Sequence, residues 1–180
     1  MKIFGIDPGS ERTGYGCIET LGSRHHLVIC GTISAPARAT FPEKLKHIHL
    51  GLAALLRRHR PDCVAVENLF HARNVRSALK LGHARGIALL AACEAGVPVV
   101  EYAPAEIKRA VVGFGRAEKV QVQEMIKLLL GLDAVPSPHD AADALAVAIC
   151  HVHSATGIIA ERSAIDKPHT SLRSWRDFRP

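Results

Sequence analysis

The stretch Lys2-Ile3-Phe4-Gly5-Ile6-Asp7-Pro8-Gly9-Ser10 decides the fold. Residues 2–7 alternate weakly in polarity, and Pro8-Gly9-Ser10 is a turn signal, so the stretch predicts a first strand that stops at an acid. Two more β-rich stretches follow after short turns, at 13–20 and 26–34. The three together predict an antiparallel meander.

Beyond this meander the apolar residues recur every three or four positions, which predicts a helix instead of a strand. Thr40 and Glu43 stand three apart as a capping box, and Pro42 lies in the first turn, where its missing N–H costs little. The apolar face of this helix consists of Phe41, Leu45, Ile48, Leu52 and Leu55.

The next strand, Cys63-Val64-Ala65-Val66, is apolar on successive residues, which is typical of a strand buried on both faces, and it ends at a second acid, Glu67. Pro98 favours an edge position for the last strand. Together these elements predict an α/β fold, a mixed five-stranded sheet flanked by helices. After Glu67 we expect a helix at 75–95, a strand at 97–102, and helices at 104–112, 117–130 and 137–153.

Length and composition exclude several classes of protein. The 180 residues are 48% hydrophobic and 22% charged, which is typical of one ordinary globular domain. We expect this domain to span 1–154 and a flexible tail to span 155–180, where the pattern fails. No run approaches the ~18 apolar residues of a membrane span, and the start lacks a secretory signal. We therefore expect a soluble, cytoplasmic protein with no membrane partner.

The charge and the cysteines add weaker constraints. Lys and Arg number 23 against 17 Asp and Glu, a net charge of +6 that mildly favours a polyanionic partner. The five cysteines are far apart and form no Cys-x-x-Cys pair, so we expect reduced, buried thiols instead of disulfides or a zinc site.

Four acids stand out by position: Asp7 and Glu67 at strand ends, and Asp140 and Asp143 on the last helix. Strand ends at one edge of a sheet converge, and helix positions three apart share a face, so the four can meet at one site. Clustered carboxylates raise one another's pKa unless a cation lies among them. Mg²⁺, or alternatively Mn²⁺, prefers such oxygen ligands, and two ions stabilise the attacking and leaving oxygens of a phosphodiester. The pattern favours metal-dependent phosphodiester hydrolysis.

Simpler interpretations of the same acids stay open at this point. Asp140 also fits a capping box with Ser137, and Asp143 lies early enough in the helix to suit its dipole. Asp7 before Pro-Gly also fits a plain turn aspartate. Glu67 is harder to explain in this way, because an acid directly after a buried strand needs a cleft or a cation.

Basic side chains gather in two stretches that suit a phosphate backbone or, alternatively, a solvated helical face. Phe70, beside the first stretch, is suited to stacking on an unpaired base, although core packing is the commoner role of Phe. Gly82 and Gly86 permit close approach either to the sheet or to another subunit. His139 is notable because it adjoins Asp140. The basic stretches contain Arg73, Arg76, Lys80 and Arg85, and Lys108, Arg109, Arg116 and Lys119.

Five motifs, in order over about residues 1–153, resemble the bacterial RuvC family of Holliday-junction resolvases, the crossover junction endodeoxyribonucleases. The matching motifs are Ile6-Asp7-Pro8-Gly9, Glu67-Asn68-Leu69-Phe70, the run from Ala78 to Gly86, the run from Ala117 to Gln123, and the run from Asp140 to Ala146.

The resemblance implies an RNase H-like fold and a homodimer that places two active sites on a four-way DNA junction and nicks strands of like polarity symmetrically. It implies catalytic and metal-binding roles for Asp7, Glu67, Asp140 and Asp143, and a catalytic role for Lys119. It also implies cooperation with the branch-migration proteins RuvA and RuvB. The resemblance assigns DNA contacts to Phe70, Lys108 and Lys119, and the basic stretches add Arg73, Arg76, Lys80 and Arg116 as expected DNA-binding residues.

Three alternatives remain. An actin-like kinase or ATPase shares the Asp-x-Gly after a first strand, but that fold needs two such domains and a longer chain. An RNase H-like nuclease acting on RNA or on an RNA–DNA hybrid shares the acids. A non-catalytic junction-binding protein would use the acids only structurally, and would need no metal to act.

Overall fold

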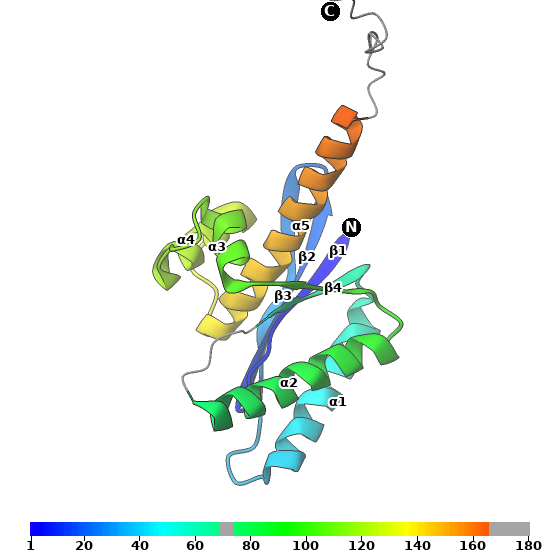
Figure 1. The fold of residues 1–180 in the computed structure, drawn as a ribbon, viewed down its shortest axis with the longest axis vertical. Coiled ribbons are helices and arrows are strands. Elements are labelled where there is room, and N and C mark those ends of the chain that lie inside the picture. Colours follow the sequence, from blue (N-terminus) through cyan, green and yellow to red (C-terminus); the bar gives the residue numbers. More distant parts are fainter. Residues whose placement is uncertain (69–73, 166–180) are drawn as a thin grey trace, which may run out of the picture.

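The computed structural model describes residues 1–68 and 74–165. Figure 1 shows a central sheet with helices on both of its faces. The strands are β1 (Lys2–Asp7), β2 (Arg12–Leu21), β3 (Arg24–Ser34), β4 (Cys63–Glu67) and β5 (Val99–Tyr102). The helices are α1 (Phe41–His59), α2 (Val75–Glu94), α3 (Pro104–Val112), α4 (Lys119–Leu130) and α5 (His139–Ile165).

The sheet has five strands in the order β3-β2-β1-β4-β5, which confirms the predicted meander and the edge position of β5. β1 pairs antiparallel with β2 and parallel with β4. Ile6 lies beside Val66 in the β1–β4 register. The acids that follow these two residues, Asp7 and Glu67, therefore end neighbouring strands at the same edge.

Each face of the sheet carries its own apolar core. Phe4, Ile6, Val64 and Val66 pack against α1 and α2. Ile3, Ile18 and Ala65 pack on the opposite face against α3, α4 and α5. Side chains two or four residues apart on a strand lie on the same face of the sheet. Asp7 therefore lies on the same face as Ile3, and Glu67 on the same face as Ala65, which is the face that α5 covers. Figure 1 shows α5 lying along this face.

Close contact between α5 and the sheet depends on glycine. A Cβ on Gly14 would lie 2.0 Å from the backbone oxygen of Asp140, and a Cβ on Gly5 would lie 2.0 Å from that of Ala144. Any other residue at these positions would push the helix away from the sheet. The missing side chains therefore bring the start of α5 down beside the end of β1.

The structure confirms the predicted start of the first helix and corrects the predicted end of the last one. The capping box at the start of α1 is confirmed, because Glu43 accepts hydrogen bonds from the Thr40 backbone N–H and hydroxyl, both at 2.7 Å. The predicted end of the last helix near residue 153 is wrong, because α5 continues to Ile165. An established helix gains one hydrogen bond per added residue, so Gly157 alone did not end it.

Other expectations hold only in part. All five cysteines are free, and three of them, Cys17, Cys63 and Cys150, are buried. Phe70, Arg73 and residues 166–180 lie outside the described residues, so the expectations about them stay predictions. Within the described ranges, no helix is both long and apolar enough to cross a membrane.

Candidate active site

The four predicted acids converge where β1, β4 and the start of α5 meet. Carboxylate oxygens of Asp7, Asp140 and Asp143 all lie within 4.8 Å of one another. Glu67 joins the group at the end of the neighbouring strand β4, close enough for its charge to raise the pKa of Asp7. A cleft of about 350 Å³ opens here, and Asp7, Glu67 and Asp143 line it.

Burial and mutual repulsion make ionisation of this cluster unfavourable. Burial raises the pKa of Asp7 to about 8, helped by the charges of Glu67, Asp143 and Asp140. Burial also raises the pKa of Glu67, with Asp143 adding to the effect. Such repulsion between carboxylates disappears when a cation lies among them. The protein's own cations therefore do not suffice to keep all four carboxylates ionised at this edge.

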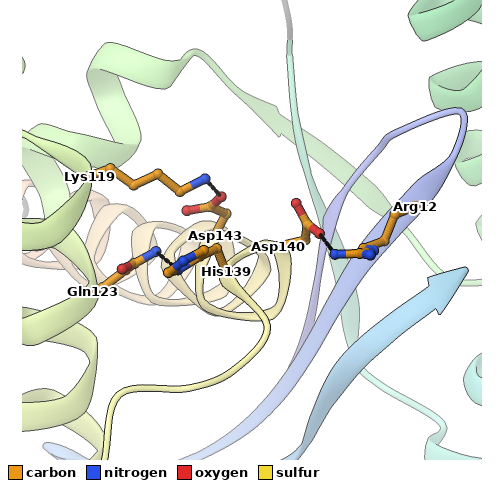
Figure 2. A network of polar contacts seen from close by, with 6 residues as sticks. All are labelled: Arg12, Lys119, Gln123, His139, Asp140 and Asp143. Carbon is orange, nitrogen blue, oxygen red and sulfur yellow. Dashed lines mark hydrogen bonds and ion pairs between the residues drawn. The ribbon is translucent and has the colours of Figure 1, made fainter.

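Each helix acid has a basic partner (Figure 2). The ammonium of Lys119, at the start of α4, lies 2.5 Å from Asp143 Oδ2. Burial alone would lower the pKa of Lys119, but its hydrogen bond to Asp143 and the charges of Asp143, Asp7 and Asp140 raise it. Arg12, at the start of β2, places Nη1 3.6 Å from Asp140 Oδ2. These partners favour a site role for the acids over helix capping, the interpretation that the sequence left open.

Arg12 is a residue that sequence reasoning missed. It follows the Asp7-Pro8-Gly9 turn, but the neighbouring residues give no sign of a functional role. Arg12 lies near the site only because β2 pairs with β1. A second missed residue is Gln123 on α4, whose amide Nε2 donates a hydrogen bond to His139 Nδ1 at 2.9 Å (Figure 2). The sequence singled out His139, but only as a neighbour of Asp140.

The predicted DNA-binding residues fall into two groups. Lys108 lines the cleft with Lys119, and Arg116 is exposed on the connection between α3 and α4. Arg76 and Lys80 are exposed on α2, and the Lys80 ammonium lies 5.8 Å from the centroid of the Phe41 ring. Arg85, from the same basic stretch, bonds instead to Glu101 on β5, with Nε 2.7 Å from Oε1.

The two glycines of α2 have open space around them. A Cβ added at Gly82 or at Gly86 would meet no atom within 4 Å among the described residues. Leu79, three residues before Gly82, is 60% exposed. Neither glycine is therefore needed for close packing of α2 on the described residues, and the subunit-interface interpretation stays a prediction.

Comparisons with known proteins identify the family to which this chain is similar. The family model described as crossover junction endodeoxyribonuclease RuvC matches residues 3–151. A protein of that name from Citrifermentans bemidjiense is 55% identical over 155 residues, which cover 86% of this chain and 94% of the relative. Another from Pelobacter propionicus is 49% identical over 180 residues and covers all of both chains.

A solved structure extends the likeness to three dimensions. Thermus thermophilus RuvC in complex with Holliday junction substrate has a TM-score of 0.80 and 35% sequence identity, over 87% of this chain and 96% of that one. The expected RNase H-like architecture is thereby confirmed. The chain belongs to the RuvC family of crossover junction endodeoxyribonucleases.

Proposed function

We propose that this protein is an endonuclease that resolves four-way (Holliday) DNA junctions in recombination and repair. The observation that carries the proposal is the convergence of the four acids beside Lys119, in a chain that belongs to the RuvC family. The solved relative that binds Holliday junction substrate supports the choice of DNA. We place the nuclease domain within residues 1–154 and its action in the cytoplasm, where chromosomal DNA of bacteria lies.

The donor set fits a divalent cation. Asp7, Asp140 and Asp143 each offer a carboxylate oxygen within 4.8 Å of the other two, and Glu67 lies in the same cleft. All are hard oxygen ligands, which suit Mg²⁺ and Mn²⁺ better than softer metals. We propose two Mg²⁺ ions per site, with Mn²⁺ as a substitute. When bound, such ions supply Lewis-acid stabilisation of the scissile phosphate.

The protein's own residues divide the work. Asp7 is the most central acid, held on a strand buried in the sheet, and is suited to serve both metal positions. Glu67, Asp140 and Asp143 would complete the two sets of ligands. Lys119 is protonated at neutral pH, and its contact with Asp143 raises its pKa further, so it offers positive charge where charge develops on the phosphate. Lys108 adds a second cation on the cleft wall.

DNA contacts outside the cleft are proposed on charge and exposure. Arg116 lies on the connection that leads to Lys119, and Arg76 and Lys80 lie on the exposed part of α2 that follows β4 in the chain. Because phosphate contacts release counterions, these residues should make binding strongly salt-dependent. Phe70 is assigned to base contacts by the family resemblance and by its position beside the first basic stretch, and Arg73 is assigned to phosphate contacts by the charge of that stretch.

A homodimer provides the second active site that paired nicking requires. Its proposed interface includes the exposed face of α2 around Leu79, Gly82 and Gly86, where the small residues allow close approach of a second copy. We further propose that the dimer works with the RuvA and RuvB branch-migration proteins, as the family resemblance implies.

The test uses a synthetic four-way junction, a linear duplex and an RNA–DNA hybrid, each incubated with the protein and either Mg²⁺ or chelator. The proposal expects paired, symmetric nicks in strands of like polarity, in the junction only and with metal only. Asp7→Asn should bind the junction without cutting it. Equal cutting of the hybrid would favour the RNA-directed alternative, and junction binding without product under every condition would favour a non-catalytic protein.

A further inference from the structure

Gln123 is an unusual residue for its position. It is only 5% exposed. Among the described residues, Thr13 is the one other buried residue with a polar side chain. Burying an amide costs free energy unless it is hydrogen-bonded. Its Nε2 donates to His139 Nδ1 at 2.9 Å, and the exposed His139 ring thereby covers the buried amide.

This hydrogen bond lies one helical turn from the Lys119–Asp143 ion pair. Lys119 and Gln123 are four residues apart on α4, and His139 and Asp143 are four residues apart on α5. Side chains four apart on a helix are neighbours on one face. The two contacts therefore form two rungs between the same pair of helices, as Figure 2 shows.

The other contacts between these helices fix their separation better than their alignment. Val122 and Ile126 of α4 pack in the same core as Ala146 and Leu145 of α5. Apolar packing is largely non-directional, whereas a hydrogen bond weakens steeply when its angle or length changes. Lys119 is a long and largely exposed side chain, whereas Gln123 is buried and its amide is fixed by the surrounding core, so the Gln123 contact is the better determinant of alignment.

We propose that Gln123 and His139 form a positioning pair, which aligns α4 with α5 so that the Lys119 ammonium is held at Asp143 in the site. The inference rests on the proposed nuclease function for its consequence, but the contact itself is independent of that function. Neither residue touches the cleft that Asp7, Glu67 and Asp143 line.

The test compares four single variants. Gln123→Leu removes the amide at similar volume, and His139→Ala removes the acceptor. His139→Asn is the rescue variant, because its Oδ1 is the same number of bonds from Cα as Nδ1 of histidine. Glu124→Gln is the matched control on the exposed side of α4. Gln123→Leu is also combined with Lys119→Met.

Single-turnover cutting of a four-way junction is expected to slow about tenfold in Gln123→Leu and His139→Ala, with junction affinity unchanged, because a misplaced group loses catalysis more than binding. His139→Asn should recover most of the native rate, and Glu124→Gln should keep it. When Lys119 is already Met, adding Gln123→Leu should lower the cutting rate less than about twofold. The effects of two coupled residues do not add, and Gln123 acts through Lys119. Full additivity, or rates for the two slow variants equal to native, would overturn the proposal.

Nuclear magnetic resonance separates this inference from the proposed function. The side-chain amide hydrogens of Gln123 should exchange slowly in the native protein and in His139→Asn, and faster in His139→Ala. Fast exchange in the native protein would overturn the positioning pair even if the junction is cut. Slow exchange in a native protein that never cuts the junction would overturn the proposed function while the contact stands.

Discussion

Replacing Asp7 with asparagine is expected to stabilise the metal-free protein at the same time as it abolishes cleavage. Asp7 lies among acids, and burial together with Glu67, Asp143 and Asp140 raises its pKa from 3.8 to about 8. A raised pKa means that the folded state holds a proton that the unfolded state releases. The free energy of unfolding therefore falls as the pH rises between these two values.

The magnitude follows from the size of the shift. At about 1.4 kcal/mol per pKa unit, the shift from 3.8 to about 8 sets an upper limit of about 6 kcal/mol. The effective dielectric near such sites exceeds that of a dry interior, which reduces this penalty. We therefore expect Asp7→Asn to gain about 2 kcal/mol at about pH 8 and much less at about pH 5, where native Asp7 is largely protonated.

Urea denaturation in chelator, at both pH values, measures the difference in unfolding free energy. Asp133→Asn is the control, because it removes one negative charge from an exposed aspartate outside the cluster. With divalent metal present, the native protein should instead be more stable than Asp7→Asn. The metal binds only the folded state and so stabilises it, and the variant offers the metal one carboxylate ligand fewer. An Asp7→Asn protein that is less stable than native at the higher pH, or equally more stable at both, would refute the reasoning.

Other substitutions test separate parts of the site. Lys119→Met should slow single-turnover cutting by about 10²–10³-fold with little loss of junction binding, and a rate near native would remove Lys119 from the mechanism. Arg12→Gln should change the free energy of unfolding by less than about 1 kcal/mol, because the Arg12–Asp140 ion pair is largely exposed. The same substitution should tighten Mn²⁺ binding measured by calorimetry, because Asp140 loses a cation that competes with the metal. Weaker binding would contradict that competition. Gly14→Ala should lower stability by about 2 kcal/mol and slow cutting, since its Cβ would lie 2.0 Å from the Asp140 oxygen; an unchanged melting temperature would show that α5 moves freely. Gly86→Ala should stabilise α2 by about 0.5–1 kcal/mol in a monomer but weaken the proposed dimer in sedimentation analysis, and an unchanged dimer would place the interface elsewhere.

Local patterns predicted most of the fold. The order of strands and helices could be predicted because turns, caps and periodicities act over a few residues, as the Thr40–Glu43 box shows. The length of α5 could not, because the weak pattern after residue 153 gave no signal for continuing. Helix propagation needs only modest propensity once a helix is established.

The site was predictable to the extent that topology brings strand ends together. Asp7 and Glu67 followed from strand ends, and Asp140 and Asp143 from their spacing on one helix. Arg12 and Gln123 did not follow, because their partners come from elements distant in the chain and a single sequence does not show such pairs. Arg85 is a further example: it belongs to a basic stretch that suits a phosphate backbone, but its partner is Glu101, which comes from a different element.

The close seating of α5 on the sheet has a consequence for how the protein fluctuates. Two of the four acids are carried by a helix whose residues Ala141, Ala144, Leu145 and Ala148 are fully buried, so they cannot separate from Asp7 without exposing one of the two cores. Local openings of folded proteins begin where few apolar contacts must break. Amide hydrogens in the second and third turns of α5 should therefore exchange only through global unfolding, at a rate that follows the stability of the whole domain.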